Sequence, residues 1–141
     1  MGRLCWKVLL HVLCFIVLAM PVGAAPYSTD PLREEAVSYL ELLDQGRYTE
    51  AWHEMTPHFQ AIDQQDQWQN RQQAIRSAYG ALEFRELFLI EYRDHYILSP
   101  DGQYVIVQFK TSFQYKASTT ETVILDCSTS PECTIRDYII R

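Results

Sequence analysis

The sequence predicts an α+β fold in which three helices precede a four-stranded antiparallel meander sheet. Before Gly80, apolar residues recur at the spacing of one helix face. After Gly80 they recur at every second position, which is the period of a strand. Because helical and strand segments are segregated along the chain, we expect the helices to pack on one face of the sheet.

The three predicted helices have recognisable starts and stops. The first spans residues 30–46 and opens with an Asp-Pro pair, an N-cap residue followed by proline at the first helical position. Thr49 is expected to cap a second, short helix, and Pro57 is expected to end it. The third helix covers residues 60–79 and stops at Gly80; its many glutamines are expected to form a solvent-facing side.

Strict alternation of apolar and polar residues marks the sheet. The first strand is interrupted by Glu86 and Asp94, where we expect a bulge or bend. Ser99-Pro100-Asp101-Gly102 has the composition of a tight turn and separates the first strand from the second. The strands are predicted over residues 82–98, 103–116, 119–127 and 134–141.

The first 24 residues have the layout of a secretory signal peptide. Arg3 and Lys7 precede a run of 13 uncharged residues, and small residues follow before Ala24. The run is shorter than the roughly 20 residues that a membrane-spanning helix needs. We therefore expect cleavage after Ala24 and export to the bacterial periplasm or beyond, leaving residues 25–141 as one domain. The alternative is a retained membrane anchor.

The net charge of the chain bears on its partners, and its cysteine content bears on its covalent cross-links. The net charge of −6 disfavours a nucleic-acid partner. Two of the four cysteines leave with the signal peptide, and Cys127 and Cys133 remain as an even pair in an exported chain. We expect a structural disulfide between them; the alternative of a redox or metal-binding pair has neither C-x-x-C spacing nor a histidine nearby.

Three charged residues interrupt otherwise apolar patterns. Arg85 and Glu121 lie on predicted strands, and Arg76 lies on the third predicted helix. A carboxylate among apolar neighbours needs a charged partner, so we expect Arg85 and Glu121 to pair across the sheet with Arg76 close by. The functional alternative is an anion-binding pocket, because arginine presents a fork of donors to an anion.

Other candidate chemistry is weaker. Asp94 and His95 are adjacent on a strand and therefore point to opposite faces. His53 and His58 lie five residues apart with a proline between them, which is not a helical metal-ligand spacing. Phosphate-binding glycine motifs and a nucleophile elbow are absent from the sequence. We expect no catalytic residue, no metal site and no cofactor.

An ordered set of residues runs from the helices to the end of the chain: Ala51-Trp52, Trp68, Arg76, Gly80, Arg85, 100–105, Thr111, Phe113, 121–123 and 138–141. This set resembles the bacterial exported proteins of the domain-of-unknown-function family numbered 4019. The resemblance covers about residues 33–141 and implies an exported helix-then-sheet domain, cystatin-like or nuclear-transport-factor-like. It implies no activity. The chain departs from the family where a tryptophan and a glycine are usual, at Cys133 and Asp137.

These observations predict a non-enzymatic exported module that binds an unknown small ligand or a protein. A small hydrolase or isomerase that uses a cavity of the sheet is the alternative from another class. It would need two titratable groups in one pocket, and the sequence shows no such pair. A membrane-tethered accessory domain is the third possibility, if the N-terminal segment is retained.

Overall fold

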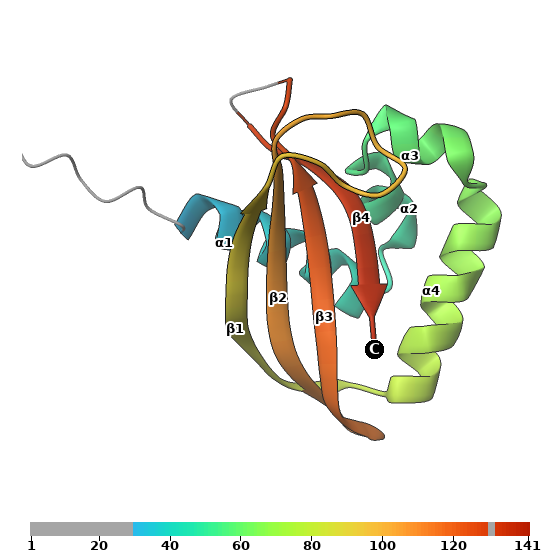
Figure 1. Cartoon of the computed structure of the whole chain (residues 1–141). Coiled ribbons are helices and arrows are strands. Elements are labelled where there is room, and N and C mark those ends of the chain that lie inside the picture. The colour runs from blue at the N-terminus through green and yellow to red at the C-terminus, as the bar shows by residue number, and fades with distance from the viewer. Residues whose placement is uncertain (1–29, 130–131) are drawn as a thin grey trace, which may run out of the picture.

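The computed structural model describes residues 30–129 and 132–141, and the predicted signal peptide lies outside this part of the chain. Helices come first and a meander of four antiparallel strands follows, in the order β1-β2-β3-β4 (Figure 1). The predicted α+β fold is confirmed. The elements are α1 (Asp30–Asp44), α2 (Tyr48–His53), α3 (Pro57–Ile62), α4 (Gln65–Tyr79), β1 (Leu82–Arg93), β2 (Tyr104–Phe113), β3 (Lys116–Asp126) and β4 (Thr134–Ile140).

The described chain has four helices where three were predicted. α2 begins at Tyr48 with Arg47 at its N-cap position, so Thr49 lies inside the helix and does not cap it as predicted. The helix ends at His53, before Pro57, and Pro57 itself opens α3, because proline fits the first helical position. The Thr56 hydroxyl accepts a hydrogen bond from the Phe59 N–H at 3.3 Å and caps this extra helix. Asp63 is extended (φ −128°, ψ 162°), which separates α3 from α4 within the stretch predicted as one helix.

Gly80 ends α4 as predicted. It has a φ of +79°, a conformation that L side chains rarely adopt. A Cβ at this position would lie only 2.7 Å from the Tyr115 ring. The chain can therefore turn from the last helix into β1 only at a glycine.

Strand β1 is shorter than predicted, ending at Arg93, and its irregularities lie elsewhere. The pairing with β2 shifts between Leu82 and Phe84 and again between Leu87 and Leu89, not at the acidic residues that the sequence suggested. Each bulge reverses which face the following side chains occupy. The even-numbered apolar residues of β1 therefore do not all share one face.

The helices cover one face of the sheet, which we call the inner face; the other is the outer face (Figure 1). The hydrophobic core lies between the helices and the inner face. Its members are fully or nearly fully buried and come from every layer: Ala36, Tyr39, Leu40, Leu43, Ala51, Trp52, Met55, Phe59, Trp68, Val105, Val107, Phe109, Val123, Leu125, Ile135 and Tyr138.

Cys127 and Cys133 form the predicted disulfide, with their Cα atoms 4.3 Å apart. Cys127 directly follows β3 and Cys133 directly precedes β4. The bond thus closes the β3–β4 connection at its base.

Candidate functional site: a buried charge cluster and an open sheet face

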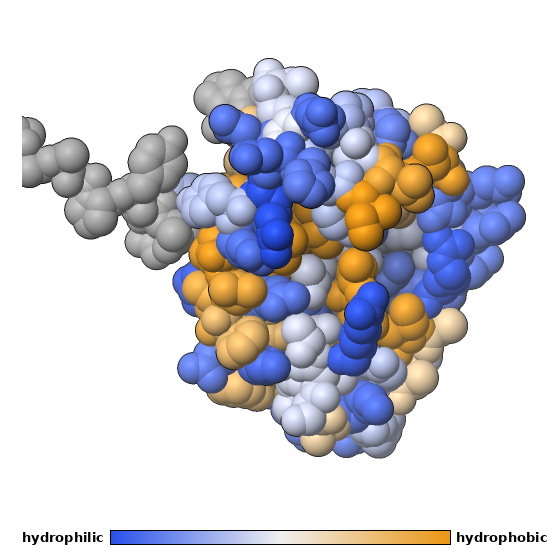
Figure 2. Space-filling model, viewed as in Figure 1, coloured by the Kyte–Doolittle hydropathy of each residue, from blue (hydrophilic) through white to orange (hydrophobic). Residues whose placement is uncertain are grey.

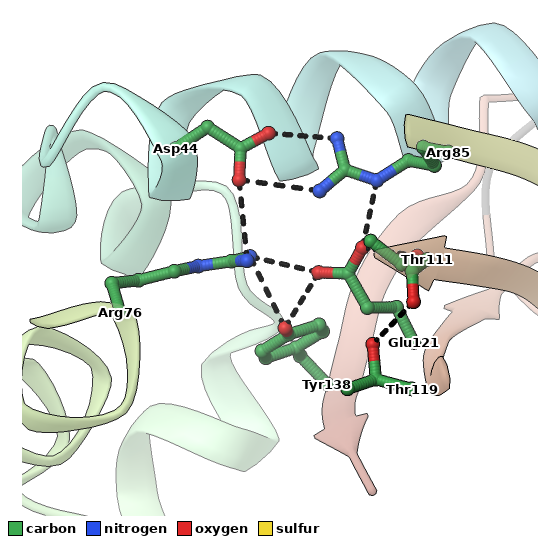
Figure 3. Close-up of polar contacts among 7 residues, drawn as sticks. All are labelled: Asp44, Arg76, Arg85, Thr111, Thr119, Glu121 and Tyr138. Atoms are coloured by element: carbon green, nitrogen blue, oxygen red, sulfur yellow. Dashed lines mark hydrogen bonds and ion pairs between the residues drawn. The ribbon is translucent and has the colours of Figure 1, made fainter. Parts of the chain in front are cut away.

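The structure brings Arg76, Arg85 and Glu121 together on the inner face of the sheet (Figure 3). Arg85 Nε donates to Glu121 Oε2 at 2.7 Å, and Arg76 Nη2 donates to Glu121 Oε1 at 2.9 Å. Glu121 has no exposed surface, and each arginine side chain is 8% exposed. The two oxygens of one carboxylate therefore bind one arginine each.

Asp44, at the end of α1, completes this group. It accepts two hydrogen bonds from Arg85, at 2.7 and 3.2 Å, and its Oδ1 lies 3.2 Å from Arg76 Nη1. We call Asp44, Arg76, Arg85 and Glu121 the charge cluster. Sequence reasoning missed Asp44, although it follows Leu40 by four residues and so continues the buried stripe of its helix.

Neutral side chains provide the remaining hydrogen bonds to the Glu121 carboxylate. The Tyr138 hydroxyl accepts from Arg76 at 3.1 Å and donates to Glu121 at 2.8 Å. The Thr111 hydroxyl donates to Glu121 at 2.8 Å, and Thr119 donates to the Thr111 carbonyl oxygen at 3.0 Å. Glu121 therefore accepts four hydrogen bonds, from residues on α4, β1, β2 and β4.

The electrostatics of the cluster favour the charged forms. Burial alone would raise the pKa of Glu121, but the Arg85 and Arg76 guanidinium groups outweigh burial and hold this pKa below its ordinary value. Burial, reinforced by the Glu121 carboxylate, raises the pKa of Tyr138 well above its ordinary value and keeps the hydroxyl protonated. Two positive and two negative charges cancel, so the cluster is neutral as a whole.

The Arg76 guanidinium contacts aromatic rings as well as charged groups. Its guanidinium carbon lies 5.1 Å from the centre of the Phe113 ring and 5.7 Å from that of Tyr138. Among the described residues, its Nε and Nη1 make no hydrogen bond of good geometry, although Nη1 is within ion-pair distance of Asp44. The faces of the Phe113 and Tyr138 rings attract the guanidinium and partly compensate for the hydrogen bonds that Nε and Nη1 lack.

A pocket of about 380 Å³ opens beside the cluster, at the junction of α1, α2, α4 and β1. Asp44 and Arg76 reach its wall, but both already bind their partners within the cluster. An anion in this pocket would meet a carboxylate as well as a guanidinium. The pocket is lined by Asp44, Gln45, Gly46, Tyr48, Arg76, Ser77, Gly80, Ala81 and Leu82.

The arrangement of the cluster is that of a structural clamp. It joins the end of α1 and the last turn of α4 to the middle of the sheet, through side chains whose charges are matched. A buried carboxylate with four donors is not poised to take a proton from a substrate. The Arg85–Glu121 pair thus explains why charges interrupt apolar patterns in the sequence.

In the described part of the chain, no hydrogen bond or ion pair joins His53, His58 or His95 to the charge cluster. His58 Nε2 lies 3.0 Å from the carbonyl oxygen of Leu98, which belongs to the loop that follows β1. His53 closes α2, and His95 lies beyond the end of β1. In residues 30–129 and 132–141, no group of three or more histidine, cysteine or acidic side chains is placed to hold a metal ion.

The outer face of the sheet has a different character. Phe84, Phe88 and Leu89 of β1 are 54%, 59% and 39% exposed there. Figure 2 shows apolar side chains gathered over β1 and around the loop of residues 94–103, with polar ones between them. A hollow of about 440 Å³ lies on this face, which we call the outer hollow. It is lined by Phe88, Tyr96, Ile106, Gln108, Lys110, Thr120, Thr122, Ile124, Ile139 and Arg141.

Fold and site together define a small α+β domain, clamped internally by a charge cluster and open on one face of its sheet. The chain belongs to the family described as "Protein of unknown function (DUF4019)", whose model matches residues 35–132. No curated protein and no solved structure matches the chain. Among the described helices, none is both long and apolar enough to span a membrane.

Proposed function

We propose that this domain is an exported, non-enzymatic binding module that takes a small ligand or a protein on the outer face of its sheet. The proposal of export rests on the signal-like order of residues 1–24 and on a disulfide, which persists in oxidising compartments. The proposal of binding rests on the outer face.

The observation that carries the proposal is the exposure of large apolar side chains around the outer hollow. Phe88 is 59% exposed at its edge, and Phe84 and Leu89 extend the apolar surface along β1. Exposed apolar surface next to a concave region is typical of interaction sites, because leaving it in water is unfavourable.

A hydrolase or isomerase working in a cavity of the sheet receives less support. The four charges of the charge cluster neutralise one another. At the outer hollow, the Tyr96 hydroxyl already donates a hydrogen bond to the Asp137 carboxylate at 3.0 Å. The residues that line the outer hollow have aliphatic, aromatic, hydroxyl, amide and cationic side chains, and no carboxylate or histidine side chain is among them to act as a base. This composition suits binding better than proton transfer.

The test compares material that co-purifies with the full chain from cells that express it naturally. Phe88→Ser removes an apolar side chain from the outer hollow. Ile62→Ser, at the end of α3, is a matched control because Ile62 is 60% exposed on the helical side. We expect mass spectrometry to find a molecule retained by the wild type and the control but lost from Phe88→Ser. Equal recovery from all three proteins would contradict the proposal.

A further inference from the structure

Strand β1 is the uncovered edge of the sheet (Figure 1). In the order β1-β2-β3-β4, β1 and β4 each have a strand neighbour on one side only. The free side of β4 is partly closed, because Met55 forms a parallel bridge with Ile135 and the Thr56 N–H donates to the Ile135 carbonyl oxygen at 2.8 Å. Within the described residues, no segment pairs with the free side of β1. Its backbone donors and acceptors there are open to another strand.

Large apolar side chains are exposed on both faces of this edge strand. Leu89 lies with Phe84 on the outer face, and its register partner is Gln108. Tyr92 is the register partner of the buried Val105 and so lies on the inner side, yet it is 57% exposed. A ligand on one face of the sheet would leave the other face of β1 in water. A strand that adds alongside β1 would cover side chains on both faces.

The charges of β1 favour a second copy of the same strand in antiparallel orientation. Glu83 lies near the start of β1, where its carboxylate accepts a hydrogen bond from the Ser112 hydroxyl at 3.3 Å. Arg93 ends the strand and pairs with Glu91 at 2.7 Å, in a half-exposed ion pair. Antiparallel pairing brings the acidic start of each strand beside the Arg93 end of the other. Parallel pairing would place like charges opposite each other, which is destabilising.

The bulges of β1 are compatible with this pairing. Residues 84–87 and 89–93 form two runs in regular register with β2, and Phe88 separates them. A two-fold axis near Phe88 sets each run of one copy along the other run of its partner. Glu86, the acid within the first run, has Lys110 as its register partner on β2, so a cation lies beside it.

We infer that two copies of the chain associate through β1, so that their two sheets join into one continuous antiparallel sheet. A strand of 12 residues is about 40 Å long, and a sheet layer is about 10 Å thick. Covering this edge on both copies removes about 800–1,000 Å² of surface, which is small for a specific interface and fits a dissociation constant in the micromolar range. The inference goes beyond the proposed function, because the outer hollow is lined mainly by β2 and β3 and remains open in the dimer.

Sedimentation equilibrium of the purified protein, over about 1–500 µM, tests the inference. The mass of the wild type should rise from that of a monomer to that of a dimer. Leu89→Lys on the outer face and Tyr92→Lys on the inner side should each raise the dissociation constant about tenfold or more, because each places like charges at the shared edge. Ile62→Lys is the matched control, since Ile62 is 60% exposed on α3, outside β1. It should dimerise like the wild type, and circular dichroism checks the fold of each variant.

Hydrogen exchange then locates the interface. Amides of β1 should exchange more slowly as the protein concentration rises, whereas those of β4 should be unaffected. A monomer at every concentration, or a dimer that survives both β1 variants, would overturn the inference. Exchange of β1 that does not depend on concentration would overturn it as well. If Leu89→Lys dissociates the dimer and Tyr92→Lys does not, the partner covers only the outer face and pairing through the edge is wrong.

Discussion

Arg85 Nε lies 2.7 Å from Glu121 Oε2 on the inner face of the sheet, and the same arginine fork binds Asp44 at the end of α1. Burial alone would lower the pKa of Arg85, but Asp44 and Glu121 reverse this and raise its pKa. One guanidinium thus connects a helix terminus to a central strand. The helical layer and the sheet are fastened by charge as well as by apolar packing.

Tyr138→Phe should destabilise the domain because it removes the hydroxyl that bridges Arg76 and Glu121. A hydrogen bond to a charged group contributes about 1.5–3 kcal/mol, and we expect a loss of that size in denaturant unfolding. Tyr39→Phe is the matched control: the Tyr39 hydroxyl is buried and has no hydrogen-bond partner among the described residues. Its removal should be neutral or stabilising, and equal losses in both variants would contradict the role given to Tyr138.

The stability of the domain should depend on pH through Glu121. Its folded pKa lies below the ordinary value of 4.5, so the unfolded chain takes up the proton first as pH falls. The stabilisation is fully present above pH 4.5 and declines as pH falls through the folded pKa. The difference in unfolding free energy between wild type and Glu121→Gln should therefore shrink below pH 4.5. A difference that stays constant down to pH 2 would show that this carboxylate does not titrate as described.

Removing the Cys127–Cys133 disulfide should lower the free energy of unfolding modestly. Cys127 and Cys133 are separated by six positions, and closing so short a loop stabilises by about 2 kcal/mol through the entropy of the unfolded chain. Replacing both cysteines by serine should lower the unfolding free energy by this amount and make it insensitive to reductant. Full labelling of both cysteines by a thiol reagent in the unfolded, unreduced protein would show that the bond is absent.

Processing of the N-terminus should leave a chain that begins at Ala25 or Pro26. The small residues before the predicted cleavage point motivate this expectation. Intact-mass measurement of the exported protein checks it. A mass that includes residues 1–24 would instead favour the membrane-tethered alternative.

Much of the fold follows from local sequence rules. Periodicity predicted all four strands, although β1 ends at Arg93 and not at residue 98. Gly80 marked the change from helix to strand because only glycine fits its positive φ. The role of Pro57 was predicted only in part. Proline was expected to end one helix, but it also fits the first turn of the next. The break at Asp63 carries no proline or glycine and could not be read from the sequence.

The candidate site was predictable in part. Arg76, Arg85 and Glu121 were found because charges stood within apolar patterns. Asp44 was missed because an acid at a helix end normally faces solvent, and only the packing of α1 on the sheet turns it inward. The exposure of Phe88 on the outer face was also not predicted. A bulge changes the face of the sheet on which side chains lie without altering the alternation of residue types in the sequence.

The measurement that tests the central claim most directly is a double-mutant cycle on Arg85 and Glu121. The claim is that these charges hold the fold, so that binding is left to the outer face. Arg85→Met and Glu121→Gln should each cost about 3–5 kcal/mol, since each leaves the buried cluster with one uncompensated charge. The double variant should recover part of the loss, with a coupling of about 0.5–3 kcal/mol. The exposed pair Arg47–Glu50 provides a control in which Glu50→Gln should change stability little. Strictly additive losses, or single losses no larger than that of the control, would contradict the claim.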